Sequence, residues 1–297
     1  MRRCGFLQNS YKGLVSGLSS VLIFHLMTLL VKLAEQSVDH WMVIFVRSFF
    51  AIAIMLPLVL RSKPYLGKRK GLLVIRGIAG FFSISCGFYT LGHLPLLDAT
   101  VLFQLAPLFV LPLSAFLLNE RARPMEMILM IVGFLGILLI AKPTHGVFSF
   151  PALVGIAGSV CTAVVFIIIR ELRHTDRSSV NVMYFGIVSL AGSTPNSILN
   201  LHELSLFLLL IIGITGIFAS LAQWLMSTAY QYERANRIAM LNFVGVPLAA
   251  LFGYLFWNER PDALTIMGGA IAIGAVIAIQ VLKERKAPQK SGSTTAG

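Results

Sequence analysis

Ten long apolar runs dominate this sequence and constrain its fold more than any other feature. Each is about 20 residues long, which is the length that an α-helix needs to cross the hydrocarbon core of a bilayer. The runs lie at residues 13–34, 41–60, 71–91, 97–118, 124–141, 151–169, 180–200, 206–229, 237–257 and 262–282. The segments between them are short and leave no room for an extramembrane domain. The sequence therefore predicts an all-α integral membrane protein with ten transmembrane helices.

The composition excludes most soluble classes. Hydrophobic residues make up 57% of the chain and charged residues 12%, which is about half the charged share of an ordinary soluble domain. A soluble protein of this length needs more polar surface to cover its core. We therefore exclude a soluble enzyme, a disordered chain and a nucleic-acid partner, although the formal charge is +12. The sequence also has no metal-ligand cluster, phosphate loop or nucleophile motif, so we expect no cofactor and no catalysis.

Basic residues are distributed unevenly among the segments that join the apolar runs. When alternate segments are counted together, nineteen Lys and Arg residues fall on one side of the membrane and only Lys142 and Arg260 on the other. The richer side includes the tails 1–12 and 283–297. Because Lys and Arg accumulate in cytoplasmic loops, we expect both tails in the cytoplasm and the protein in the inner or plasma membrane.

A short motif occurs twice, about half the chain apart. Asn119-Glu120-Arg121 joins the fourth and fifth runs, and Asn258-Glu259-Arg260 joins the ninth and tenth. A proline lies inside the preceding run in both copies, at Pro107 and Pro247. We interpret the pattern as a duplication of a five-helix unit.

The duplication predicts two repeats of opposite orientation, at 13–142 and 151–282, because a unit of five crossings reverses direction in its second copy. Inverted repeats are typical of secondary transporters, which bind substrate near the midplane between the two repeats. A channel or a scaffold built from the same duplication is the alternative.

Several segments resemble a known family. The segment FYTLGHLPLLDATVLFQLAPLFVLPLSAFLLNER (88–121) and its degenerate partner NFVGVPLAALFGYLFWNER (242–260) resemble EamA-type members of the drug/metabolite transporter superfamily. FVRSFFA (45–51) and VIRGIAGFF (74–82) resemble the branch that contains S-adenosylmethionine uptake carriers. The resemblance implies ten helices in two inverted five-helix repeats around a central cavity. It specifies transport but not substrate, because the superfamily carries amino acids, nucleotide derivatives, organic acids, sugar phosphates and drugs.

Two arginines inside the runs are candidates for substrate binding. A charged side chain in hydrocarbon is costly and marks a functional site by default, and Arg47 and Arg76 lie several residues inside their runs. Snorkelling to the headgroups is the alternative for both, and it is the interpretation we favour for Lys32. No run carries a carboxylate at its middle. We therefore expect a basic cavity that binds an anionic or zwitterionic metabolite through Arg47 and Arg76.

His25 is the one titratable group near mid-membrane that can gain a proton near neutral pH. Its alternative is a neutral histidine that hydrogen-bonds within the bundle. Since no mid-run carboxylate is present, we predict a facilitator or exchanger without obligatory proton coupling.

Uncharged polar residues complete the candidate binding set, and we expect about half of them to face the cavity. They are Tyr89, Gln104, Gln223, Trp224, Tyr230 and Asn242. Pro107 and Pro247 are candidate hinges for alternating access, with static kinks as the alternative. Glycine pairs in the fifth and tenth runs permit close packing within one chain or between two chains of a homodimer.

These features predict a secondary membrane transporter of a small polar metabolite. The specific hypothesis is uptake of S-adenosylmethionine or an amino-acid-like compound. An exporter of amino acids or drugs is the alternative within transport. Outside transport, the alternatives are a membrane-embedded acyltransferase-type enzyme, for which the sequence lacks a His or acid cluster, and a non-transporting scaffold.

Overall fold

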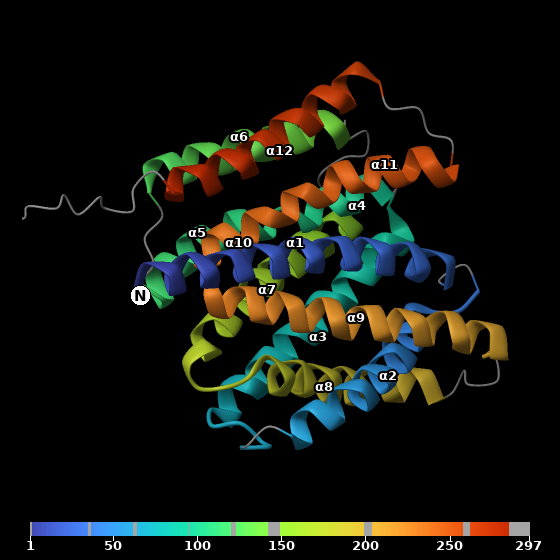
Figure 1. Cartoon of the computed structure of the whole chain (residues 1–297). Coiled ribbons are helices and arrows are strands. Elements are labelled where there is room, and N and C mark those ends of the chain that lie inside the picture. Colours follow the sequence, from blue (N-terminus) through green and yellow to red (C-terminus); the bar gives the residue numbers. More distant parts are fainter. Residues whose placement is uncertain are drawn as a thin grey trace, which may run out of the picture.

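In the computed structural model the chain folds into helices (Figure 1). The structure describes residues 2–34, 37–61, 64–94, 96–119, 123–141, 149–198, 204–257 and 262–284. The helices are α1 (Arg2–Ala34), α2 (His40–Leu60), α3 (Lys70–His93), α4 (Leu96–Phe103), α5 (Ala106–Leu117), α6 (Pro124–Ala141), α7 (Phe150–Glu171), η1 (Leu172–His174), α8 (Ser178–Ile198), α9 (Leu206–Tyr232), α10 (Ala235–Leu241), η3 (Asn242–Val244), α11 (Gly245–Trp257) and α12 (Ala263–Glu284). No strand occurs in these ranges, so the all-α class is confirmed.

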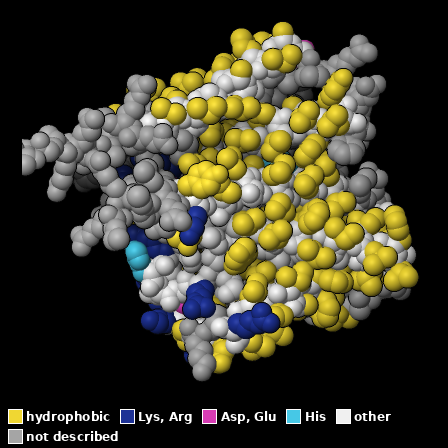
Figure 2. Space-filling model, viewed as in Figure 1, with side chains coloured by type: hydrophobic (Ala, Val, Ile, Leu, Met, Phe, Trp, Pro, Cys, Tyr) yellow, Lys and Arg dark blue, Asp and Glu magenta, His cyan; other side chains and the backbone are white. Residues whose placement is uncertain are grey.

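The helices have the length and composition of membrane spans. Within the described ranges, seven stretches are long and apolar enough to cross a bilayer, and two shorter apolar helices lie at Pro124–Leu139 and Ile266–Ile279. Apolar side chains cover much of the described surface in this view (Figure 2), as expected where helices face lipid. The chain is an integral membrane protein, while the number of ten crossings stays a prediction.

The closest helix pairs each join the first half of the chain to the second. α1 packs along α9, α2 along α8, α3 along α7, and α6 along α12. Exchanging the two halves turns the α1–α9 pair into the α7–α3 pair and leaves the other two pairs unchanged. This exchange pattern is the one expected of two related halves that pack against each other. The repeat boundaries themselves, 13–142 and 151–282, stay predictions.

α6 and α12 lie together at one edge of the bundle (Figure 1). A Cβ atom at Gly136 would come within 2.8 Å of the Gly268 carbonyl oxygen, so the missing side chain at Gly136 allows the two backbones to approach closely. The glycine-rich surfaces are therefore used within one chain here, and a homodimer stays a prediction.

Two of the expected spans are interrupted rather than continuous. The span expected at 97–118 divides into α4 and α5, and the span expected at 237–257 divides into α10, η3 and α11. Proline has no backbone N–H, so Pro107 and Pro247 leave the carbonyl four residues earlier without its helical donor. That residue is a phenylalanine in both cases, Phe103 and Phe243. The two breaks therefore have the same chemical cause.

Asn119 ends the first half's interrupted span. It has a φ angle of +53°, the left-handed conformation that commonly follows the last turn of a helix. The first residue of the Asn-Glu-Arg motif, Asn119, therefore lies just beyond the last turn of α5. Glu120, Arg121 and the whole second motif, 258–260, lie outside the described residues.

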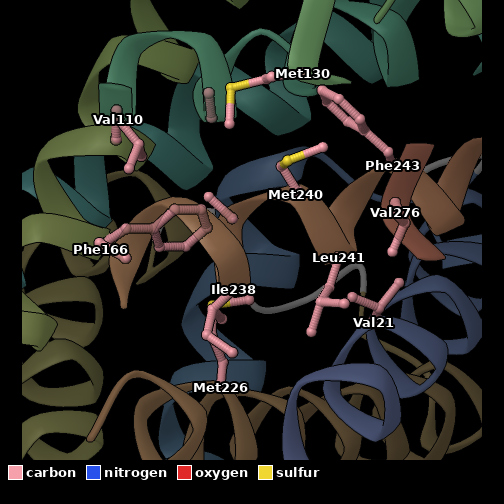
Figure 3. Close-up of a cluster of buried hydrophobic side chains, with 14 of the residues drawn as sticks. Val21, Val110, Met130, Phe166, Met226, Ile238, Met240, Leu241, Phe243 and Val276 are labelled. Atoms are coloured by element: carbon pink, nitrogen blue, oxygen red, sulfur yellow. The ribbon is translucent and has the colours of Figure 1, made fainter. Parts of the chain in front are cut away.

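A buried apolar cluster joins the two halves of the chain (Figure 3). Its members come from α1, α4, α5, α6, α7, α9, α10, η3, α11 and α12. Those drawn with labels are Val21, Val110, Met130, Phe166, Met226, Ile238, Met240, Leu241, Phe243 and Val276. In a membrane such close side-chain packing holds helices together, because lipid tails are as apolar as the side chains. The cluster forms one wall of the candidate site.

Candidate functional site

A cavity of about 240 Å³ lies between the two halves of the chain. A water molecule takes about 30 Å³, so the space holds several waters or a small metabolite. Six of the nine predicted binding residues line it, together with the predicted hinge Pro107. These six are His25, Arg47, Arg76, Gln104, Gln223 and Asn242. Residues widely separated in the sequence therefore meet at one site.

Arg47 on α2 and Arg76 on α3 are almost completely buried, with 2% and 0% of their surfaces exposed. Arg76 Nη2 donates a hydrogen bond of 2.7 Å to Gln223 Oε1. Arg47 Nη1 lies 3.8 Å from the Met27 sulfur, which is a weak acceptor. Both side chains are enclosed by other helices and line the cavity, so both charges belong to it.

Both guanidinium groups lie over the ring of Phe185 on α8. The distance from the ring centroid is 4.6 Å to Arg76 Cζ and 5.6 Å to Arg47 Cζ. An aromatic face attracts a cation within about 6 Å, so one ring partly offsets both charges. A Cβ atom at Gly80 would lie 2.7 Å from a carbon of this ring. The glycine therefore makes room for Phe185 beside Arg76.

Phe185 is a functional candidate that the sequence did not reveal. It is one of 21 phenylalanines, and nothing in its neighbours along the chain distinguishes it. Only the packing of α8 against α2 and α3 brings its ring beside both arginines.

The site has more hydrogen-bond donors than acceptors. Arg47 Nε, Arg76 Nε and Arg76 Nη1 are buried and have no partner. None of the described lining residues is an Asp or Glu. Buried cations are normally paired with an acid. The cavity is therefore basic and supplies donors to an anion.

Two amide side chains lie where the interrupted spans break. Gln104 follows the last residue of α4, is 4% exposed, and its Oε1 has no partner. Asn242 begins η3 and donates from Nδ2 to the Ala239 carbonyl over 3.0 Å. Interrupted helices at a midplane cavity are a common way for carriers to present polar groups to substrate. Both breaks of this chain reach the same cavity.

His25 is held by its own helix and by a glycine of the other half. Its Nδ1 lies 2.9 Å from the Val21 carbonyl oxygen, so the Nδ1–H tautomer donates there and leaves Nε2 as an acceptor. A Cβ atom at Gly245 would collide with the imidazole ring. Gly245 is therefore required for His25 to reach the cavity wall in this position.

The other four candidates lie outside the cavity lining. Tyr89 stacks on His93 with a centroid distance of 4.0 Å. Trp224 follows the cavity-lining Gln223, and adjacent residues of a helix point about 100° apart. It therefore lies on the outer face of α9, where it is 36% exposed. Tyr230 is buried against Phe166. Pro247 also lies away from the lining, although the break that it causes reaches the cavity through Asn242.

An ion cluster at one end of the bundle was not anticipated as a buried feature. Arg237 of α10 lies 3.2 Å from Glu126 of α6 and 3.5 Å from Glu233 at the end of α9, and all three side chains are buried. The sequence placed both acids at span ends. Only the tertiary structure brings them to one arginine and links the two halves there.

Comparisons with known proteins agree with this geometry. Residues 11–142 and 149–281 each match the model of a family described as the EamA-like transporter family. A protein named pseudopaline exporter CntI, from Pseudomonas aeruginosa PAO1, is 32% identical over 270 residues, covering 88% of this chain and 93% of that protein. A protein named S-adenosylmethionine uptake transporter, from Rickettsia bellii, is 30% identical over 254 residues, covering 84% and 86%. These are transporters by name, not enzymes.

One solved crystal structure superposes on the chain with a TM-score of 0.75. It is 19% identical and covers 93% of this chain and 99% of its own. At that identity the likeness concerns the fold alone.

Proposed function

Because the chain belongs to the EamA-like transporter family, of the drug/metabolite transporter superfamily, we propose that it is a secondary carrier of a small anionic or zwitterionic metabolite. One observation carries the proposal. Arg47 and Arg76 are buried and line the cavity between the two halves, and no described lining residue is an acid. Such a site attracts a carboxylate or phosphate, and it repels the lipophilic cations that a drug exporter with a buried acid would take.

The proposed mechanism is alternating access by ten membrane-crossing helices arranged as two inverted five-helix repeats. The α4–α5 and α10–α11 units each count as one crossing in this scheme. Pro107 and Pro247 are the proposed hinges, because the carbonyls that they leave unbonded let each span bend beside the cavity. The substrate then contacts the two arginines and the amides near the breaks.

Both termini are proposed to lie in the cytoplasm of a cell whose inner or plasma membrane holds the protein. The dark blue Lys and Arg side chains visible in Figure 2 gather at the end of the bundle where the N-terminus lies. A basic end of this kind is typical of the cytoplasmic side.

The names of the two relatives suggest two candidate substrates and two opposite directions of transport. One is named for uptake of S-adenosylmethionine and the other for export of pseudopaline. Uptake of S-adenosylmethionine or an amino-acid-like compound is the specific candidate. Export is the second candidate, because the relative named as an exporter matches more of this chain.

The test is ligand-induced stabilisation followed by counterflow in liposomes. A compound that binds the folded protein raises its melting temperature. The panel is S-adenosylmethionine, amino acids, dicarboxylates, nucleotides and tetraphenylphosphonium, applied to the wild type, Arg47→Gln and the control Arg69→Gln. Arg69 forms an exposed ion pair with Glu171, so its loss leaves the cavity unchanged.

We expect an anionic or zwitterionic compound to stabilise and exchange in the wild type and in Arg69→Gln but not in Arg47→Gln. Stabilisation by tetraphenylphosphonium alone would refute the proposal. Equal loss of folding and binding in Arg47→Gln would make Arg47 a structural residue.

A further inference from the structure

We propose that the substrate carries two acidic groups and an N–H donor, and therefore belongs to the amino dicarboxylic acids and their N-substituted derivatives. The inference rests on the proposed carrier function and narrows it. It selects among the anionic and zwitterionic compounds that the function leaves open.

The first argument is charge balance. Arg47 and Arg76 present two positive charges to one cavity, and at most 2% of the surface of either residue is exposed. A buried charge without an opposite charge is costly because the local dielectric is low. A ligand with one acidic group neutralises only one guanidinium. A ligand with two acidic groups neutralises both. The second acidic group therefore adds favourably to the binding free energy, as the first does.

The second argument is reach. Both guanidinium carbons lie within 5.6 Å of the centroid of the Phe185 ring, so the two charges border the same part of the cavity. A single small molecule can therefore meet both. Two acidic groups a few bonds apart match two donors held around one ring.

The third argument is the inventory of unpartnered donors. Arg76 already uses Nη2 in the hydrogen bond to Gln223. The nitrogens without a partner are Arg76 Nε, Arg76 Nη1 and Arg47 Nε. They are distributed over both guanidinium groups. One carboxylate at each guanidinium supplies an acceptor to Arg47 Nε and to one of the two Arg76 nitrogens, since Nε and Nη1 of one guanidinium face different sides. A single carboxylate shared between the two arginines supplies fewer acceptors.

The fourth argument concerns hydrogen-bond acceptors on the cavity wall. Gln104 Oε1 is a buried acceptor without a partner on the cavity wall, and His25 Nε2 is an acceptor in the Nδ1–H tautomer. A buried acceptor left unpaired costs free energy. An amine or ammonium N–H on the substrate satisfies it, and a dicarboxylate without nitrogen does not.

The same charges disfavour a substrate with net positive charge. S-adenosylmethionine carries one carboxylate, an ammonium and a sulfonium. Its two cationic centres would lie in a cavity that already contains two guanidinium groups. We therefore expect it to bind more weakly here than an amino dicarboxylate.

The experiment compares four probes on the purified wild-type protein by isothermal titration and by competition in counterflow. Glutamate has two acids and an amine, glutarate has two acids, glutamine has one acid and an amine, and S-adenosylmethionine is cationic. We expect glutamate to bind at least tenfold more tightly than glutamine, several-fold more tightly than glutarate, and more tightly than S-adenosylmethionine.

Variants then assign each preference to its residue. Arg47→Gln and Arg76→Gln should each reduce the glutamate-over-glutamine preference several-fold, because each removes the partner of one acid. Arg76→Lys keeps the charge and should retain most of the preference. Gln104→Leu should reduce only the glutamate-over-glutarate preference. Arg69→Gln, outside the cavity, should leave every ratio unchanged.

The outcomes separate this inference from the proposed function. Equal or tighter binding of glutamine or S-adenosylmethionine by the wild type overturns the two-acid inference and leaves an anion or zwitterion carrier intact. Equal binding of glutarate and glutamate overturns the inference that the substrate carries an N–H donor. Binding of tetraphenylphosphonium with none of the four probes overturns both the inference and the proposed function. The wild-type ratios decide these cases even if a variant does not fold.

Discussion

Arg76 Nη2 donates a 2.7 Å hydrogen bond to Gln223 Oε1, and this bond crosses from α3 in the first half of the chain to α9 in the second. Both residues line the cavity. The amide therefore acts as the acceptor that a carboxylate would otherwise provide, and it does so without cancelling the charge. A neutral partner keeps the site basic while it fixes the position of the guanidinium.

Replacing this partner tests that role. Gln223→Leu removes the acceptor and should destabilise the protein by about 1.5–3 kcal/mol, the range for a hydrogen bond to a charged group. Gln223→Glu should instead raise the melting temperature and abolish stabilisation by anions, because the new carboxylate neutralises Arg76. Thermal unfolding with and without ligand measures both effects. Retained anion binding in Gln223→Glu would show that the charge of Arg76 is not used.

The contact between Gly245 and His25 predicts a size-dependent defect. Gly245→Ala places a methyl group against the imidazole and should cost about 1–3 kcal/mol, as overpacking does. The double variant Gly245→Ala/His25→Ala should recover part of the loss, because the two changes are coupled. Gly274→Ala is the matched control, since no atom lies within 4 Å of the Cβ it would add. Additive losses in the double variant would contradict the contact.

The ion cluster at the end of the bundle predicts a large stability effect from one charge. Arg237→Gln leaves Glu126 and Glu233 buried without their arginine, and should destabilise by about 3–5 kcal/mol. Arg69→Gln breaks an exposed pair with Glu171 and should cost at most about 1 kcal/mol. Denaturant unfolding in detergent compares the two. Similar losses would mean that burial does not strengthen the Arg237 pairs.

Proton coupling is expected to be absent, because the described cavity lining has no carboxylate and His25 is already hydrogen-bonded through Nδ1. Substrate exchange in liposomes should proceed at the same rate with and without a pH gradient. His25→Gln should keep this insensitivity. A gradient-driven uptake that disappears in His25→Ala would refute the prediction and make His25 a proton relay.

The two prolines predict a separation of binding from turnover. Pro107→Ala and Pro247→Ala restore the backbone N–H at these positions, which can donate to the carbonyl oxygens of Phe103 and Phe243, so each change should straighten its span. Counterflow should slow several-fold while ligand-induced stabilisation is retained. Pro112→Ala, at an exposed position inside α5, is the control and should leave the rate unchanged. Unaltered rates in both hinge variants would identify static kinks.

The sequence by itself determined the class of protein and most of its helices. The runs at 124–141 and 41–60 coincide with α6 and α2 within one residue, because the hydrocarbon core selects a fixed length of apolar helix from local sequence. The duplicated Asn-Glu-Arg motif and the paired prolines indicated two related halves, and the two family matches cover those halves. Arg47 and Arg76 were detectable because a charge in an apolar run stands out.

The tertiary structure decided which side chains share the cavity. Gln223 lines it and its neighbour Trp224 faces outward, a difference set by how α9 is rotated against its neighbours. The ring of Phe185 lies beside both arginines, and Arg237 meets two acids, only because α8 and α10 pack where they do. Hydrophobicity along the chain specifies that a segment crosses the membrane. The rotation and packing of each helix depend on contacts with segments distant in sequence, and these contacts exist only in the folded bundle.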